Sequence, residues 1–235
     1  MKIEIWSDFT CPYCYLGKTK LELALDQFSH KEKVRIEYAS FQLDPNAEVQ
    51  SNKMVYDMLM EKFRQSLEQV RTMTEELSMQ AEEIGLDFQF EKMPQVNTYD
   101  AHRLVKYAKK ENKELEMVNK IFRGYFSEGK RIDDHSVLLD MAMDVGIERE
   151  AVEEVLSVNC CAKSVKTDIE TASEIGIQGV PFFIFNEKYS VSGAQPVEVF
   201  INALDQIWQE NHVKEVVDED TTCKTNYCVG PDCED

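Results

Sequence analysis

The chain has 235 residues, of which 43% are hydrophobic, and it carries a formal net charge of −18. The hydrophobic content is sufficient for a folded core, and the negative charge disfavours both nucleic acid and anionic membranes as partners. No run approaches the roughly 18 apolar residues of a membrane span. Met1 is followed by no apolar secretory signal, so a cytoplasmic protein is expected if this is the native start.

The N-terminal part predicts a parallel βαβ unit that contains a pair of cysteines. Residues 2–6, KIEIW, alternate as a strand does, and apolar residues recur at approximate helical spacing after Cys14. A second alternating run, residues 34–43, ends at Asp44. Two strands joined by a helix favour a parallel pair with a right-handed crossover.

The long middle section predicts helices only, because it is rich in Met, Leu, Glu and Lys and has few strand-like runs. We expect helices near residues 51–84, 98–111, 115–127, 135–145, 148–157 and 160–174. Four methionines mark one face of the first helix: Met54, Met58, Met73 and Met79. We interpret this face as ordinary core packing, with a binding groove as the less favoured alternative.

Strand-like sequence returns near the C-terminal end. Residues 179–185, GVPFFIF, and the following KYSVSGA predict a β-hairpin, and residues 196–211 predict an amphipathic closing helix. The chain is therefore expected to be an α/β protein in which βαβ and ββα segments share one mixed sheet around a large all-helical insertion. The expected parts are a discontinuous domain of residues 1–46 and 175–213, a helical domain of residues 47–174, and an acidic tail of residues 214–235.

Cys11 and Cys14 are the leading candidates for chemistry. Cys11 would lie at the N-terminus of the first helix, where free N–H groups and the helix dipole favour a thiolate. Cys14 would lie about one turn further along, within reach of Cys11, and Pro12 suits the first helical turn. This arrangement predicts dithiol–disulfide exchange, in which Cys11 attacks and Cys14 resolves a mixed disulfide. Tyr13 adds no positive charge to stabilise the thiolate.

Two other interpretations of a Cys-x-x-Cys pair are a zinc site and inert thiols. No second Cys-x-x-Cys or Cys/His pair lies at zinc-finger spacing, and only cysteines of the tail are left to complete a site, so we expect no metal. The chain has seven cysteines, and an odd number without a secretory signal argues against a static disulfide scaffold. The βαβ context favours the redox interpretation.

The segment GVPFF is the second feature that points to chemistry. A proline at the start of a core strand normally weakens the ladder, but Pro181 fits there if the Val180–Pro181 bond is cis. In a thioredoxin-type architecture this loop faces the cysteine pair, and the backbone of Val180 can then bind an extended peptide. The alternative is a plain proline at a strand entry. Val180, Pro181, Pro12 and Tyr13 are thus the candidate substrate contacts.

Several segments, in order, resemble the DsbA-like thioredoxin-fold oxidoreductases, and in particular the FrnE type, described as protein-disulfide-isomerase-like. They are DFTCPYCYLGK, FQLDP, NTYDAHRLVKYA, FRGYFSEGKRIDDHSVLLDMA and IGIQGVPFFIFNEKYSVSGAQ. The resemblance extends from residue 2 to about residue 210. It implies a thioredoxin-like domain with an inserted helical domain, Cys11 as nucleophile, Cys14 as resolving thiol and Pro181 as the cis-proline.

The resemblance also draws attention to His102 and Arg103, which form a pair often found in the family. His102 is a candidate substrate contact above Cys11. The favoured alternative is that the two residues cap a helix or join the two domains.

The remaining cysteines are of two kinds. Cys160 and Cys161 are adjacent on an expected helix, where neighbouring side chains diverge, so buried free thiols are expected. Cys223, Cys228 and Cys233 recur at intervals of five in the tail. They suggest an accessory redox element, for example a Cys223–Cys228 disulfide that exchanges with the first pair, with zinc binding as the alternative.

Three functions remain open, in order of preference. The first is a thiol–disulfide oxidoreductase or disulfide isomerase that acts on protein or peptide thiols. The second is a glutathione-linked isomerase or transferase of small molecules, which the same superfamily contains, although those enzymes usually have serine at the first active-site position. The third is a non-catalytic, redox-responsive binding module. We expect no bound cofactor, with glutathione as a candidate redox co-substrate.

Overall fold

The computed structural model describes residues 1–219 and contains a four-stranded mixed sheet in the order β2-β1-β3-β4. The strands are β1 (Lys2–Ser7), β2 (Arg35–Ser40), β3 (Phe182–Phe185) and β4 (Tyr189–Ser192). β1 pairs with β2 in parallel and with β3 in the antiparallel sense, and β3 and β4 form the predicted hairpin. The N-terminal βαβ unit and the C-terminal ββα unit therefore meet at β1, as the sequence pattern predicted.

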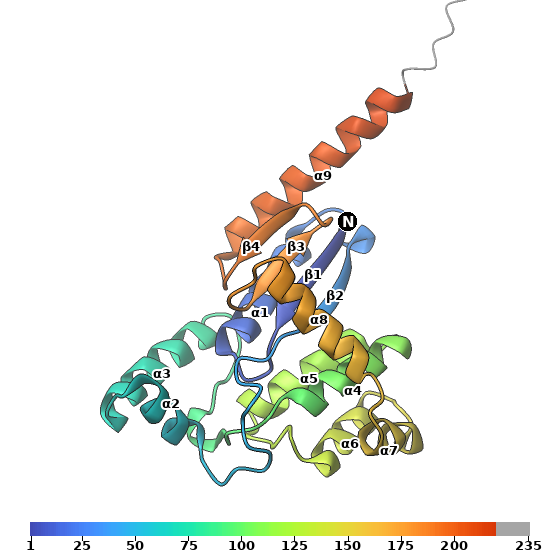
Figure 1. Cartoon of the computed structure of the whole chain (residues 1–235). Coiled ribbons are helices and arrows are strands. Elements are labelled where there is room, and N and C mark those ends of the chain that lie inside the picture. Colours follow the sequence, from blue (N-terminus) through green and yellow to red (C-terminus); the bar gives the residue numbers. More distant parts are fainter. Residues whose placement is uncertain (220–235) are drawn as a thin grey trace, which may run out of the picture.

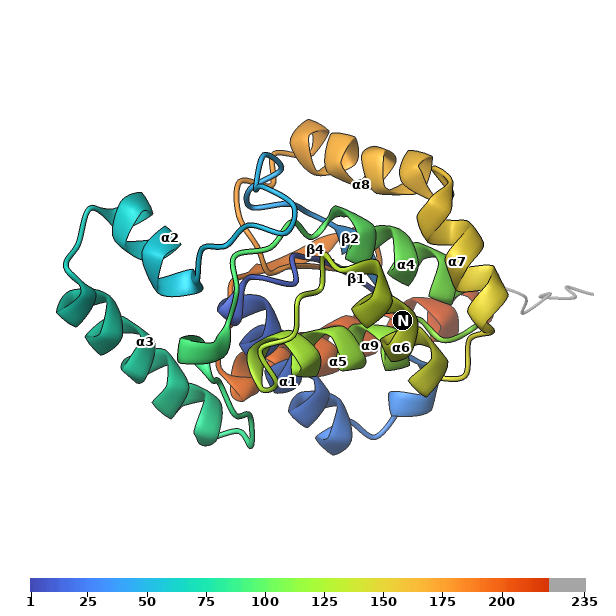
Figure 2. The ribbon, with the colours of Figure 1, turned by 90° about the horizontal axis from the view of Figure 1, so that it is seen from below.

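Helices cover both faces of this sheet (Figures 1 and 2). On one face, Ile3 and Ile5 of β1 join a core with α1 (Pro12–Gln27) and α9 (Val197–Glu219). On the other face, Trp6 packs with Ala172 of α8 (Ala162–Glu174). Alternation along β1 explains this division, because successive side chains of a strand point to opposite faces.

The position of α8 bears on the domain boundaries. The carboxylate of Asp168 on α8 accepts a hydrogen bond from the backbone N–H of Ser40 on β2, with 2.6 Å between the two atoms. The indole N–H of Trp6 donates to the backbone carbonyl of Asp168. Because α8 is bonded to the sheet, we propose that the thioredoxin-like domain resumes ahead of α8 and not at residue 175.

The helical insertion differs from the expected one near its start. Its helices are α2 (Val55–Phe63), α3 (Leu67–Glu82), α4 (Tyr99–Lys110), α5 (Glu114–Phe126), α6 (His135–Asp144) and α7 (Arg149–Ser157). The single helix expected over 51–84 is wrong. The chain turns at Arg64, which has a left-handed φ of 53°, and α3 starts again where Ser66 and Gln69 form a capping box. Short 3₁₀ turns lie at Lys31–Lys33 (η1) and Phe90–Lys92 (η2).

The closing helix is longer than expected. α9 continues to Glu219, beyond the expected end at residue 211, and the boundary of the acidic tail at residue 214 stays a prediction. Within residues 1–219, none of the helices has the length and hydropathy that crossing a membrane requires.

Candidate active site

Cys11 lies at the junction of the β1–α1 turn and the α1 helix. It is the N-cap residue of α1, with extended backbone angles, and Pro12 occupies the first helical position. The Cys11 amide donates to the carbonyl of Asp8 at 3.2 Å, and the Cys14 amide donates back to the Cys11 carbonyl at 3.0 Å. The backbone thus places one thiol at the positive end of the helix dipole and the other one turn inside, as the spacing predicted.

The loop ahead of β3 forms the wall that faces Cys11. The Val180–Pro181 peptide bond is cis, which confirms the prediction made from the GVPFF segment. The Cys11 thiol lies 3.5 Å from the backbone carbonyl of Val180 and donates to it. Gly17 of α1 permits this close approach, because a Cβ atom at residue 17 would lie only 2.9 Å from Cγ of Pro181. Sequence reasoning missed Gly17, and its only signal was a glycine inside an expected helix.

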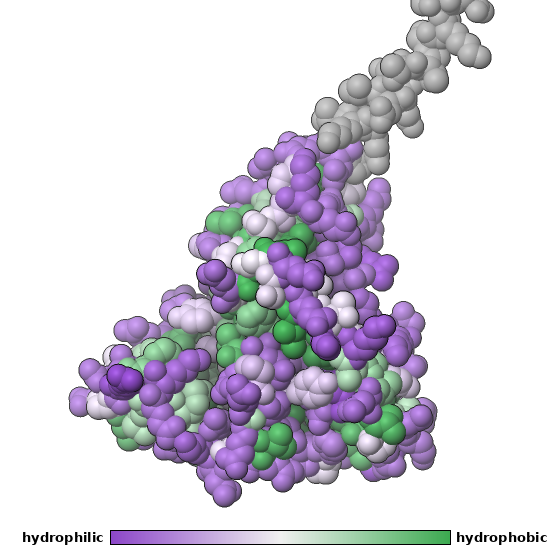
Figure 3. All heavy atoms as spheres, viewed as in Figure 1, coloured by the Kyte–Doolittle hydropathy of each residue, from purple (hydrophilic) through white to green (hydrophobic). Residues whose placement is uncertain are grey.

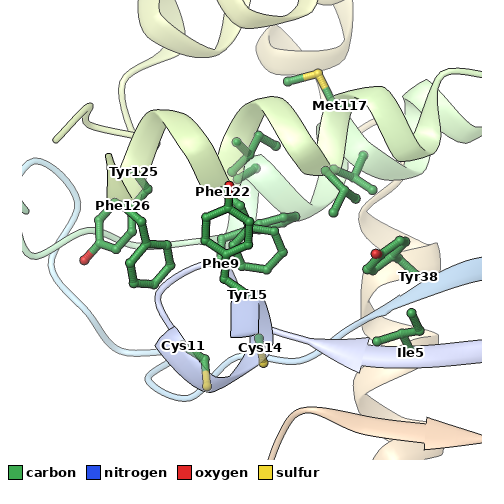
Figure 4. Close-up of a cluster of buried hydrophobic side chains, with 14 of the residues drawn as sticks. Ile5, Phe9, Cys11, Cys14, Tyr15, Tyr38, Met117, Phe122, Tyr125 and Phe126 are labelled. Carbon is green, nitrogen blue, oxygen red and sulfur yellow. The ribbon is translucent and has the colours of Figure 1, made fainter. Parts of the chain in front are cut away.

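The two thiols differ in their surroundings. Cys14 is almost fully buried, and burial raises the pKa of its thiol well above the ordinary value, with the neighbouring Cys11 thiol adding to the rise. The side chain of Ser7 and the backbone of Asp8 act in the opposite direction. Cys14 therefore stays protonated at neutral pH in the dithiol form. Both sulfurs point away from the aromatic side chains that pack above them (Figure 4).

Those aromatic side chains fix the cysteine turn against the helical insertion. Tyr15 of α1 stacks on Phe122 of α5 with ring centroids 5.0 Å apart, and Phe9 packs against the same ring at 5.1 Å. Phe126 contacts Tyr15 from the next turn of α5. Tightly packed aromatic rings of this kind allow little displacement. The insertion therefore supports the cysteine turn through these rings.

An apolar cleft of about 800 Å³ opens beside Cys11. Cys11, Pro12, Tyr13 and Val180 line one side, which places four of the predicted site residues together. The other side is lined mainly by α2, α3 and the segment around η2: Met58, Leu59, Met73, Leu77, Phe90, Met93 and Val96. Figure 3 shows hydrophobic atoms in the notch between the α2–α3 lobe and the part that carries the sheet.

The cleft changes the interpretation of the methionine face. Met58 and Met73 line the cleft next to the cysteine turn, whereas Met54 and Met79 are 37% and 58% exposed. Met58 also packs against the core, so the prediction of core packing holds for Met58 and is wrong for the exposed Met54 and Met79. The break at Arg64 is the reason, because it folds α2 and α3 into a wall that a single straight helix would not form.

His102 lies behind the cysteine turn and not in the cleft. It is buried on α4, its Nε2 is 3.4 Å from the Asp8 carboxylate, and its ring packs on Phe9. The Asp8 carboxylate also accepts from the backbone N–H of Leu43 at 2.8 Å. Because His102 is buried and does not line the cleft, we propose that it joins the two parts of the chain through Asp8 and does not contact substrate. Asp8, the residue that joins these segments, was missed by sequence reasoning.

Arg103 is also buried and has a structural role. Its guanidinium donates to the backbone carbonyls of Val155 in the last turns of α7, and of Val158 and Cys160 in the connection between α7 and α8. Cys160 and Cys161 lie in this turn, so the prediction that both are on a helix is wrong. They are free thiols, partly exposed, with their sulfurs 3.6 Å apart.

Two sequence predictions concern metals and the tail. Within the described part of the chain, no group of three or more His, Cys, Asp or Glu side chains is arranged to hold a metal ion. Cys223, Cys228 and Cys233 lie outside the described residues, so their accessory redox role stays a prediction.

This combination of a thioredoxin-like sheet, a cysteine pair at a helix N-terminus and a facing cis-proline agrees with the comparison to known families. The model of the DsbA-like thioredoxin domain matches residues 2–222, and the chain belongs to this family. It is a thiol–disulfide oxidoreductase of the DsbA-like type. The FrnE-type branch within the family stays a prediction.

Three solved structures show what the chain is similar to. A probable DsbA oxidoreductase from Streptomyces coelicolor is 37% identical, with a TM-score of 0.85 over 89% of this chain and 91% of that chain. A 2-hydroxychromene-2-carboxylate isomerase shares the fold at 18% identity and a TM-score of 0.68, over 90% of this chain and 98% of that one. The cytosolic disulfide reductase DsbM from Pseudomonas aeruginosa, solved with glutathione, shares the fold at 15% identity and a TM-score of 0.62. The match covers 89% of this chain and 100% of that chain.

Proposed function

We propose that the chain catalyses thiol–disulfide exchange on proteins or peptides, with Cys11 as the nucleophile and Cys14 as the resolving thiol. The observation that carries this proposal is the position of Cys11. Its sulfur lies at the wall of an apolar cleft, 3.5 Å from the Val180 carbonyl and at the N-terminus of α1. A cleft of this size and lining suits an apolar peptide segment beside the sulfur that reacts.

Cys11 and Cys14 together supply the two electrons that reduce a substrate disulfide. The Cys11 thiolate attacks one sulfur of a substrate disulfide, and the other substrate sulfur leaves and takes up a proton. Cys14 then loses its proton and attacks Cys11, which releases the second substrate thiol and leaves a Cys11–Cys14 disulfide. The substrate gains two electrons and the enzyme loses them. The same steps in reverse oxidise a dithiol substrate.

Val180 and Tyr13 are the proposed substrate contacts within the cleft. The backbone of Val180 lies beside the attacking sulfur, where an extended peptide can pair with it. Tyr13 is 49% exposed at the cleft and offers an aromatic surface to an apolar side chain. Met58 and Met73 supply adaptable, polarizable walls, which suits substrates of varied sequence.

The roles of the two cysteines are tested by single substitutions in the full chain. Cys11→Ser should abolish insulin reduction in the presence of dithiothreitol. Cys14→Ser should accumulate mixed disulfides at Cys11 that dithiothreitol releases. Turnover that survives Cys11→Ser would overturn the assignment.

The role of the cleft is tested by a matched pair on α3. Met73→Ala should raise the KM for an apolar peptide disulfide several-fold, because it removes part of the cleft wall. Met79→Ala is the control, because Met79 lies on the same helix but is exposed. Equal effects of the two substitutions would contradict a binding role for the cleft.

A glutathione-linked isomerase or transferase of small molecules is the second candidate. The volume of the cleft also falls in the range of small-molecule sites, and the isomerase fold is similar. The presence of Cys14 favours disulfide chemistry, with glutathione as a proposed redox co-substrate. Saturable glutathione binding with turnover that survives Cys14→Ser would favour the isomerase. A cytoplasmic location and a purely redox-responsive binding role stay predictions from the sequence.

A further inference from the structure

A second pair of thiols is brought into contact far from the candidate active site in the sequence. Cys160 and Cys161 lie in the turn between α7 and α8, and their sulfurs are 3.6 Å apart. Neighbouring residues on a helix do not face each other, so this contact needs a different backbone. Cys161 supplies it with a left-handed φ of 62°, a conformation that residues other than glycine adopt at a cost.

The backbone of this thiol pair is held in place, and the two residues are partly exposed. Nε of the buried Arg103 donates to the carbonyl of Cys160 at 3.0 Å, and the same guanidinium binds the carbonyls of Val155 and Val158. Cys160 and Cys161 are themselves only partly buried. A small thiol reagent can therefore reach them.

A helix N-terminus and a lysine lie close to one of the two thiols. Cys161 is the N-cap residue of α8, and Lys110 of α4 lies near its thiol. Burial and the neighbouring Cys160 thiol raise the pKa of Cys161, while Lys110 acts in the opposite direction. Burial thus disfavours the thiolate of Cys161, and Lys110 favours it.

We propose that Cys160 and Cys161 form a second redox couple, a vicinal dithiol that small-molecule disulfides of the glutathione type convert to a disulfide. One of the two thiols attacks one sulfur of oxidised glutathione, and one reduced glutathione leaves. The other thiol then attacks the mixed disulfide at its neighbour, which closes the Cys160–Cys161 bond and releases the second reduced glutathione. Two protein thiols lose two electrons in total, and the glutathione disulfide gains them.

The covalent geometry indicates that this disulfide is easily reversed. Adjacent Cα atoms across a trans peptide are about 3.8 Å apart, below the usual range of about 4.4–6.8 Å for disulfides. A bond closed at this spacing is strained, and strained disulfides are the labile ones. The couple is thus suited to reversible oxidation and not to permanent cross-linking.

The test uses the full chain with Cys11→Ser and Cys14→Ser, so that its outcome does not depend on the proposed function. Trypsin cleavage after Arg149 and Lys163 releases residues 150–163, which contain no other cysteines. After incubation with oxidised glutathione and blocking of free thiols, this peptide is analysed by mass without reduction. We expect it to be unblocked and lighter by two hydrogen atoms, and to regain both thiols with dithiothreitol.

A further variant separates ring closure from simple modification. With Cys161→Ser in the same background, the peptide should instead carry one glutathione at Cys160. In the Cys11→Ser/Cys14→Ser background itself, recovery of the peptide with both thiols blocked, or with glutathione attached and no ring closed, would overturn the proposal. Circular dichroism of each variant establishes that the chain is folded.

Discussion

Gly17→Ala tests whether close contact between α1 and the cis-proline loop sets the geometry of the candidate site. A Cβ atom at residue 17 would lie 2.9 Å from Pro181 Cγ, 3.2 Å from Phe183 Cζ and 3.3 Å from the Cα of Ala194. Ordinary contact begins near 3.4 Å, so the proline ring has to move by about half an ångström. The ring and the backbone at Ala194 are stiff, and neither yields by a change of rotamer.

The expected magnitude follows from two opposing terms. Replacing a glycine inside a helix by alanine stabilises the helix by about 1 kcal/mol. Overpacking a tight contact costs about 1–3 kcal/mol. We therefore expect a net loss of about 1 kcal/mol in the free energy of unfolding. The rate of insulin reduction should fall about tenfold, because a displacement of about 1 Å near reacting groups can cost about a hundredfold.

Urea unfolding and insulin reduction, measured on the same preparations, check both expectations. Gly124→Ala on α5 is the control, because its Cβ would meet the end of the Met141 side chain and Gly124 does not line the cleft. This control should leave the reduction rate unchanged, whatever it does to stability. If Gly17→Ala stabilises the chain by about 1 kcal/mol and keeps its full rate, the contact does not hold the site.

Three further predictions concern side chains around the two thiol pairs. The raised pKa of Cys14 means that its thiolate forms only at higher pH. Iodoacetamide at neutral pH should therefore label Cys11 first, and the labelling of Cys14 should increase only in alkaline solution. Equal labelling of the two cysteines at neutral pH would contradict this. His102→Ala should lower the free energy of unfolding by about 1–3 kcal/mol by removing a partner of buried Asp8, and a raised KM would instead place His102 in the substrate site. Arg103→Lys should cost about 1–3 kcal/mol in urea unfolding, because a lysine lacks the fork that binds several carbonyls, and unchanged stability would refute that role.

The sequence by itself predicted the features that depend on short segments of chain. Alternation in residues 2–6 and 34–43 predicted the strands, and the place of Cys11 between a strand and a helix predicted its N-cap position. The strands and the N-cap position follow from local conformational preferences, which a sequence pattern expresses directly. Pro181 favoured a cis bond only when considered together with the cysteine pair at the other end of the chain, and the structure contains that bond.

Only the tertiary structure decided which distant residues meet. Met58 and Met73 border the cleft beside Cys11 because the chain reverses at Arg64. No glycine or proline near Arg64 indicates this break in the sequence. His102 contacts Asp8, and Gly17 faces Pro181, because helices from separate parts of the chain pack together. Cys160 meets Cys161 because one residue adopts a left-handed backbone that Arg103 supports from another helix. Such contacts depend on packing across the whole fold, and no local pattern encodes them.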